Sequence, residues 1–200
     1  MKKAKKTRRS FIGNSYRESL KYIYDSRNFI YLSLGLFFGA SLAGFFLPVP
    51  QSVVEQIAEF IRRLLEETKD MGQFDLIRFI FLNNLQSSFI GMMFGILLGI
   101  FPALILFVNG YLLGFVSLAS IREEGILVLW RLFPHGIFEL PAVFISTGLG
   151  LKFGTFIFRK NKSDSFRKYF WNSLQAFLLV VVPLLIIAAI IEGTLIIYSG

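Results

Sequence analysis

Residues 131–154 read RLFPHGIFELPAVFISTGLGLKFG, an almost wholly apolar stretch that contains the only histidine of the chain, His135. Pro134 predicts that a helix starts there, because a proline is tolerated in the first turn, where its missing N–H would have no partner. Glu139 follows His135 by four residues, so the two side chains share one helical face. A helix this apolar indicates a lipid environment, where ionisable groups are costly and mark a candidate site.

The composition indicates an all-α polytopic membrane protein. Of the 200 residues, 54% are hydrophobic and 24 are phenylalanine, more apolar than an ordinary soluble domain. The apolar runs are long and uninterrupted, whereas the strands of a transmembrane barrel alternate with a period of two. The absence of cysteine excludes disulfides and thiolate sites. The net charge of +8 comes from basic residues beside apolar spans, which favours membrane orientation over nucleic-acid binding.

Two regions are predicted along the chain. Residues 1–28 form a basic segment that includes an interfacial amphipathic helix, although residues 1–9 are equally compatible with a solvated tail. Residues 29–200 form a single helical membrane domain. Its five expected spans cover about 29–47, 79–101, 102–120, 134–158 and 171–198, with a division near Pro102 and a kink at Pro183. The segment 50–75 contains an amphipathic helix that is too polar to cross a bilayer.

Loop charges predict the orientation of the spans. Basic residues crowd the segment 1–28 and the loop after the fourth span, which holds Arg159, Lys160, Lys162, Arg167 and Lys168. Because cytoplasmic loops carry an excess of Lys and Arg, we expect both regions inside the cell. Five spans then place the carboxy terminus and the amphipathic segment outside. The expected location is the plasma membrane, as a multi-pass protein in contact with its lipids.

Small residues recur every four positions on two of the expected spans. One set is Gly91, Gly95 and Gly99, and the other is Ala142, Ser146, Gly150 and Gly154. Small side chains at this spacing let helix backbones approach closely, which is how helices associate in lipid. The sets predict ordinary packing within the bundle, with a homodimer seam as the alternative.

Several polar residues fall at one predicted depth. At about 1.5 Å per residue, Asn84, Glu139 and Glu192 lie roughly 25 to 29 Å from the inner ends of their expected spans. His135, Asn83 and Arg122 lie slightly further out, and Arg131 belongs to the segment that would cap them. These residues form a candidate intramembrane cluster near the external face. Each also has a simpler interpretation, as an interhelical hydrogen bond, a local pair or a contact with lipid headgroups.

Four motifs carry a resemblance to a known family. They are Pro-His-Gly-Ile-Phe-Glu-Leu-Pro-Ala at 134–142, Asn83-Asn84 with the glycines and Pro102 that follow, Asn109-Gly110, and Ala189-Ile-Ile-Glu192. Together they resemble the stage II sporulation protein M family of integral membrane proteins, from residue 29 onward. In spore-forming bacteria, the resemblance implies a role in forespore engulfment, with partner proteins that remodel septal peptidoglycan. That role extends only to close relatives, and the sequence does not say whether its organism sporulates.

Three functions are compatible with these features. The resemblance favours a non-enzymatic scaffold or anchor for partner proteins on the extracytoplasmic side. The second is an intramembrane hydrolase in which His135, Glu139 and Glu192 act as zinc ligands or as base and orienter, although no HExxH motif supports it. The third is a small transporter or proton-coupled channel that uses buried Glu and His as a relay. We rank the scaffold first, and no catalytic residue is assigned.

Overall fold

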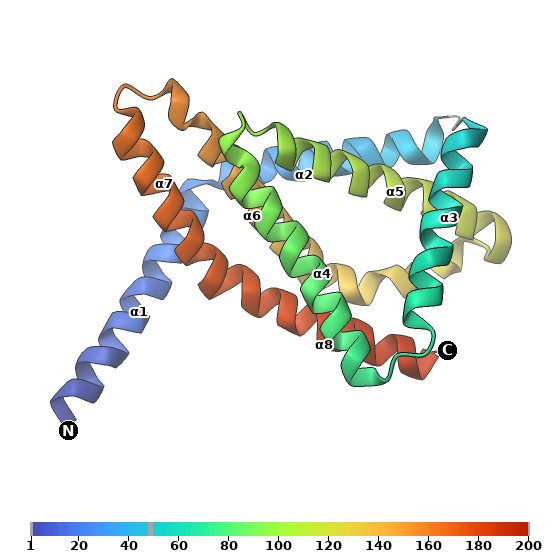
Figure 1. The fold of residues 1–200 in the computed structure, drawn as a ribbon, viewed down its shortest axis with the longest axis horizontal. Coiled ribbons are helices and arrows are strands. Elements are labelled where there is room, and N and C mark those ends of the chain that lie inside the picture. Colours follow the sequence, from blue (N-terminus) through green and yellow to red (C-terminus); the bar gives the residue numbers. More distant parts are fainter. Residues whose placement is uncertain (1, 48–49, 200) are drawn as a thin grey trace.

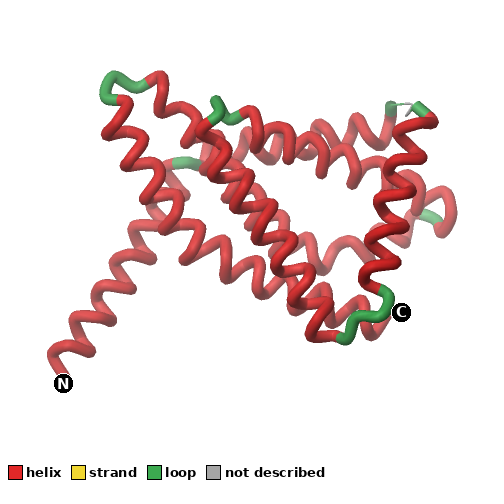
Figure 2. Tube along the Cα trace, viewed as in Figure 1, coloured by secondary structure: helices red, strands yellow, loops and turns green. Residues whose placement is uncertain are grey.

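The computed structural model describes the backbone of residues 2–47 and 50–199, and the side chains of residues 13–47, 50–129 and 136–198. Its elements are all helical, and the described residues form no strand (Figure 1, Figure 2). The helices are α1 (Lys2–Asp25), α2 (Arg27–Phe46), α3 (Gln51–Thr68), α4 (Gln73–Met93), α5 (Ile100–Glu124), α6 (Phe133–Gly154), α7 (Lys162–Ala176) and α8 (Val182–Ser199). Shorter pieces are η1 (Phe94–Ile96), η2 (Ile126–Leu132), η3 (Thr155–Phe158) and the π-helical turn η4 (Phe177–Val181).

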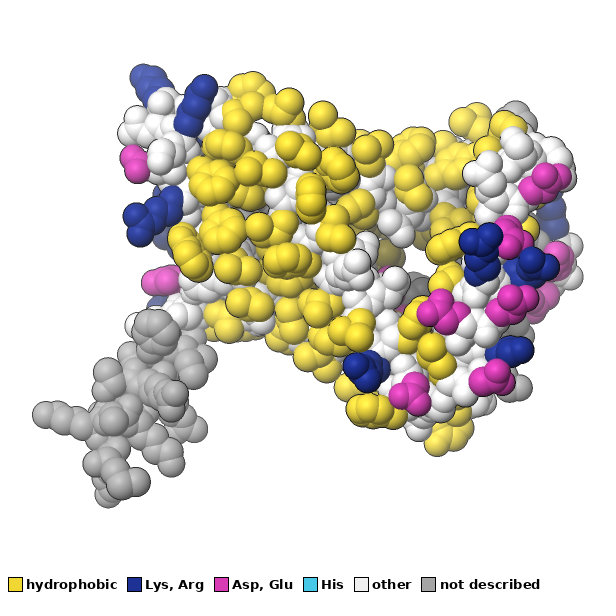
Figure 3. Space-filling view, in the orientation of Figure 1, with side chains coloured by type: hydrophobic (Ala, Val, Ile, Leu, Met, Phe, Trp, Pro, Cys, Tyr) yellow, Lys and Arg dark blue, Asp and Glu magenta, His cyan; other side chains and the backbone are white. Residues whose placement is uncertain are grey.

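Five helical segments are long and apolar enough to cross a membrane. They run over Arg27–Phe46, Gln73–Ile96, Ile100–Glu124, Gly136–Phe158 and Lys162–Tyr198. In Figure 3, hydrophobic side chains cover the middle of the molecule, whereas charged side chains gather at its two ends. This arrangement matches a bilayer, whose core excludes charge and whose two surfaces accept it. The predicted all-α, membrane-spanning fold class is confirmed.

The spans pack as two joined layers. α2 lies along α5, and α4 packs against α6 and α8, while α6 also contacts α2. α3 crosses between the end of α2 and the start of α4, at the end of the bundle opposite α7 (Figure 1). We call these two ends the α3 end and the α7 end.

The turn between α4 and α5 differs from the expected position. The chain reverses at residues 97–99, where Leu98 and Gly99 have φ values of 60° and 75°. Gly99 adopts this left-handed conformation at little cost, because it lacks a Cβ atom. Pro102 lies in the first turn of α5 and is buried, where a proline is compatible with the helix. The glycine therefore makes the turn, and the proline does not divide the spans.

Glycines bring the backbones of the helices into contact at two interfaces. Where α4 and η1 meet α6, a Cβ atom on Gly95 of η1 would clash with the backbone of Gly150, and one on Gly150 would clash with the carbonyl of Gly91 in α4. Between α2 and α5, a Cβ atom on Gly110 would clash with the backbone of Phe37. Gly44 and Gly114 on these two helices show the same closeness, to Tyr111 and Ser41. Gly110 and Gly114 are also four residues apart, so the same spacing of small residues marks the second interface in the sequence.

Polar contacts attach α1 to the bundle at the α7 end. Lys152 Nζ in α6 donates a hydrogen bond of 2.8 Å to Ser26 Oγ, and it lies 4.0 Å from the centre of the Tyr22 ring. The Tyr22 hydroxyl lies 3.3 Å from Ser173 Oγ in α7, and Gln175 Nε2 donates a hydrogen bond of 2.9 Å to the Ser15 carbonyl. α1 is therefore fixed to α6 and α7 through Tyr22 and its neighbours.

Burial of Tyr22 predicts a loss of stability in alkali. Burial raises the pKa of Tyr22 to about 12, despite the opposing hydrogen bond with Ser173. In the unfolded chain the pKa is about 10, so the unfolded state releases its proton first as the pH rises. The free energy of unfolding should fall by up to roughly 3 kcal/mol between about pH 10 and pH 12. Unfolding measured in detergent should show this loss in the wild type and a smaller one in Tyr22→Phe, whereas equal losses would contradict the prediction.

Candidate functional site

A cavity of about 1070 Å³ lies among α2, α4, α5 and α6. Polar side chains from all four helices line it, together with aromatic and aliphatic groups. The polar set consists of Ser41 from α2, Asn83, Asn84, Ser87 and Ser88 from α4, Asn109 and Ser117 from α5, and Glu139 from α6. We call these eight residues the polar lining.

The geometry of α4 explains why half of the polar lining comes from that helix. Ser87 and Ser88 follow Asn83 and Asn84 by one turn, so the four side chains lie on one face. Ser88 is 2% exposed, and its Oγ has no hydrogen-bond partner within the described protein. By contrast, Asn109 Nδ2 already donates a hydrogen bond of 2.8 Å to the Ile105 carbonyl. The polar group of the lining whose hydrogen bonding is least satisfied therefore lies on this face of α4.

The structure brings part of the expected cluster together. Asn83, Asn84 and Glu139 line the same cavity. Glu192 lies outside that lining, on α8, which packs against α6. Arg122 is exposed near the end of α5 and does not line the cavity. The side chains of Arg131 and His135 lie outside the described residues, so the proposed pair of His135 and Glu139 stays a prediction.

Helix bounds change the depths that the sequence predicts. The α4 span ends at Ile96 and begins at Gln73, whereas the prediction placed it at 79–101. Asn84 then lies about 18 Å from the α7 end of its span, close to the middle. Ser117 lies about 26 Å along α5 from Ile100. The polar lining is therefore spread through the depth of the bundle and does not form a single layer.

Four members of the polar lining, all serines, were not predicted from the sequence. Ser87 and Ser88 could have been predicted, because they are polar and follow Asn83 and Asn84 at a spacing of four residues. Ser41 and Ser117 could not have been predicted, since a lone serine in an apolar helix commonly bonds to its own backbone. Only the pairing of α2 with α5 and the placement of α4 bring these hydroxyls to one cavity.

Metal binding stays a prediction for this chain. Among the side chains that the structure describes, no group of three His, Cys, Asp or Glu could hold a metal ion. The zinc site expected from the sequence requires His135, whose side chain lies outside that set. The chemistry of the described lining is instead that of amides and hydroxyls, which donate and accept hydrogen bonds, with Glu139 as its one ionisable group.

The five membrane-length spans have an apolar surface and enclose a partly polar cavity. These features define a polytopic helical membrane protein. Comparison with known proteins is consistent with this class. The model of the family Stage II sporulation protein M matches residues 33–195. The chain belongs to this family, which confirms the resemblance seen in its motifs.

One curated relative is itself uncharacterised. Over 105 residues the chain is 33% identical to an uncharacterised protein of Methanocaldococcus jannaschii. The match covers 50% of this chain and 47% of the relative, so the chain matches about half of that protein's length. No solved structure matches this chain. The comparisons thus identify the family of this chain.

Proposed function

We propose that this protein is a non-enzymatic membrane anchor that holds a partner protein against its α3 end. The supporting observation is α3 itself. This 18-residue amphipathic helix has no buried residue, although it follows a span and precedes another. A helix that contributes nothing to the core of the bundle is available for contacts outside it.

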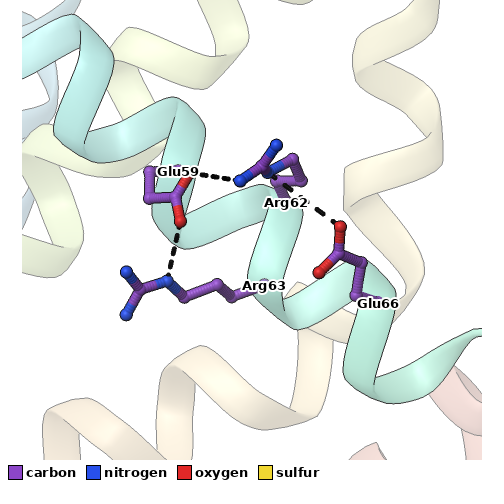
Figure 4. Close-up of polar contacts among 4 residues, drawn as sticks. All are labelled: Glu59, Arg62, Arg63 and Glu66. Atoms are coloured by element: carbon purple, nitrogen blue, oxygen red, sulfur yellow. Dashed lines mark hydrogen bonds and ion pairs between the residues drawn. The ribbon is translucent and has the colours of Figure 1, made fainter.

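The charged side of α3 has a defined pattern. Glu59 accepts hydrogen bonds of 2.9 Å from both Arg62 and Arg63, and Arg62 lies 4.0 Å from Glu66 (Figure 4). These hydrogen bonds lower the pKa of Glu59, and the bond from Arg63 has the largest effect. The Glu59 carboxylate therefore stays ionised. Exposed ion pairs contribute little to stability. Their value here is a fixed arrangement of charges that a complementary partner surface could recognise.

The apolar side of α3 fits the membrane surface. Val53, Ile57, Ile61 and Leu64 lie on one face and are partly covered, whereas Phe60 at its edge is 51% exposed. An amphipathic helix with this distribution lies in the interface, with its apolar face toward the hydrocarbon. The charged face would then point to the aqueous side, where a soluble domain of a partner could dock. We expect that side to lie outside the cell, with the α7 end in the cytoplasm.

The proposed orientation predicts opposite accessibility of two sites. The chain has no native cysteine, so single cysteines can report on each end. Glu66→Cys on α3 should react with a membrane-impermeant maleimide in intact cells. Ser163→Cys on α7 should react only after the membrane is opened. Labelling of both sites from the same side would contradict the orientation.

The anchor function predicts a partner at α3 and not at α7. A short bifunctional crosslinker attached to the thiol of the Glu66→Cys variant, in the membranes of the native host, should give an adduct with one protein of defined mass. The Ser163→Cys variant serves as the matched control and should lack that adduct. Adding Arg62→Glu and Arg63→Glu to the Glu66→Cys variant should remove the adduct, because the charge pattern that positions the partner is reversed. An adduct that survives this reversal, or that forms equally from the Ser163→Cys variant, would refute docking on α3.

A further inference from the structure

We propose that the cavity binds one amphiphilic lipid whose polar end is uncharged and carries hydroxyl groups, of the acylglycerol type. This inference goes beyond the anchor function and rests on the chemistry of the cavity alone. Three properties of the cavity carry it: an unsatisfied polar face, an aromatic face and an opening toward the bilayer.

The polar face requires a ligand with hydroxyl groups. Ser88 lines the cavity, and its buried Oγ has no hydrogen-bond partner within the described residues. A buried hydroxyl in that state is unfavourable. Asn83, Asn84 and Ser87 lie around it on the same face of α4. Amide and hydroxyl groups both donate and accept hydrogen bonds. A glycerol-type head, whose hydroxyls also donate and accept, complements this face and satisfies Ser88.

The aromatic face suits a hydrocarbon chain. Phe37, Phe38, Phe45 and Phe46 of α2 and Phe144 of α6 line the cavity. The rings of Phe37 and Phe144 meet edge to face at 5.2 Å, and that of Phe38 lies 6.0 Å from Phe144. These three rings form a connected apolar surface, and Phe45 and Phe46 pack against each other at 4.9 Å. The cavity therefore offers apolar as well as polar surface, as an amphiphilic ligand requires.

The cavity opens toward the lipid phase. Phe38, Leu42 and Ile137 line it, yet they are 46%, 60% and 50% exposed. Residues that both line a cavity and face outward mark its rim, and this rim lies on membrane-spanning segments. A ligand can therefore enter sideways from the bilayer, without passing through water.

Charge and size select among the molecules that the bilayer offers. The described residues of the lining include one acidic group, Glu139, and no lysine or arginine. These residues offer a phosphate no counter-charge to offset the cost of its desolvation. The cavity of about 1070 Å³ lies at the upper end of the range typical of small-molecule sites. Its size therefore fits one lipid molecule.

Photolabelling tests this assignment. The full-length protein in phosphatidylcholine nanodiscs would receive a diazirine-bearing monoacylglycerol, or a lysophosphatidic acid with the same chain, and adducts would be mapped by mass spectrometry. We expect the monoacylglycerol to label cavity residues such as Phe37 and Phe144. The charged analogue should label them at least about fivefold less, because its phosphate would lose hydration without a counter-charge among the described lining residues.

Variants on one helix provide the control. Asn84→Leu should reduce labelling about fivefold or more, because it removes hydrogen bonds and fills part of the cavity. Gln86→Leu is the matched control, since Gln86 is exposed on α4 and does not line this cavity. Ser88→Ala removes a single hydroxyl, so it should weaken labelling. Thermal unfolding without added lipid should stay unchanged or move to a higher temperature, because an unsatisfied buried hydroxyl is removed. Equal labelling by the two lipids, or equal effects of Asn84→Leu and Gln86→Leu, would overturn the proposal.

Discussion

Replacing Gly95 or Gly150 by leucine should prevent the bundle from folding stably. Each glycine lies where an added Cβ would meet the backbone of the other helix, and backbone cannot move aside as a flexible side chain can. Overpacking of a well-packed core typically costs about 1 to 3 kcal/mol, and separating two backbones along a whole interface should exceed that. Thermal unfolding and gel filtration in detergent should show aggregation or a much lower midpoint.

Gly39 provides the matched control for this prediction. It lies on α2, another span, and an added Cβ there would meet nothing within 4 Å. Gly39→Leu should therefore fold with an unchanged or higher midpoint, because leucine favours a helix more than glycine does. Unchanged unfolding of Gly95→Leu, or equal damage from Gly39→Leu, would show that α4 and α6 do not meet through these glycines.

Removal of the Lys152 side chain should produce the second large effect. Lys152→Ala eliminates the hydrogen bond to Ser26 and the cation–π contact with Tyr22. Hydrogen bonds to charged groups contribute about 1.5 to 3 kcal/mol, and cation–π contacts up to about 2. We expect a loss of roughly 3 kcal/mol in the free energy of unfolding, together with faster hydrogen exchange around Tyr22 as α1 loosens.

An exposed lysine on the same side of the molecule provides the comparison. Lys162, at the start of α7, is exposed and has no described ion pair or cation–π contact. Lys162→Ala should leave both stability and exchange at Tyr22 unchanged. If Lys152→Ala behaves like Lys162→Ala, then α1 is held by its other contacts, those of Tyr22 with Ser173 and of Gln175 with Ser15.

The existence of the membrane spans could largely be predicted from the sequence. The positions of their ends could be predicted less well. A span needs about 20 apolar residues that satisfy their backbone hydrogen bonds internally, so its existence depends on local composition. Its ends depend on finer effects. Pro102 predicted a division between two spans, but it is compatible with the first turn of α5, and Gly99 reverses the chain. Likewise α4 continues outward to Gln73, through Asp75 and Arg78.

The site was only partly predictable for a different reason. Asn83, Asn84 and Glu139 stood out because polar groups are rare in lipid. The other polar residues of the cavity did not stand out, because the lipid-facing and protein-facing sides of a membrane helix are both apolar. The periodicity that reveals a buried face in a soluble helix is therefore weak here. Ser41 and Ser117 became part of the site only through the packing of α2 against α5.

By itself, the sequence determined that this chain is a helical membrane protein of the stage II sporulation protein M family, with an amphipathic helix outside the bundle. These features rest on composition, short-range spacing and local motifs, which act within a few residues. The tertiary structure alone decided which glycines touch, where the polar lining gathers, and that Lys152 contacts Tyr22 of α1. Those outcomes depend on contacts between helices far apart in the chain, and in lipid such contacts are chosen by shape and hydrogen bonding, since burial of apolar surface no longer distinguishes one pairing from another.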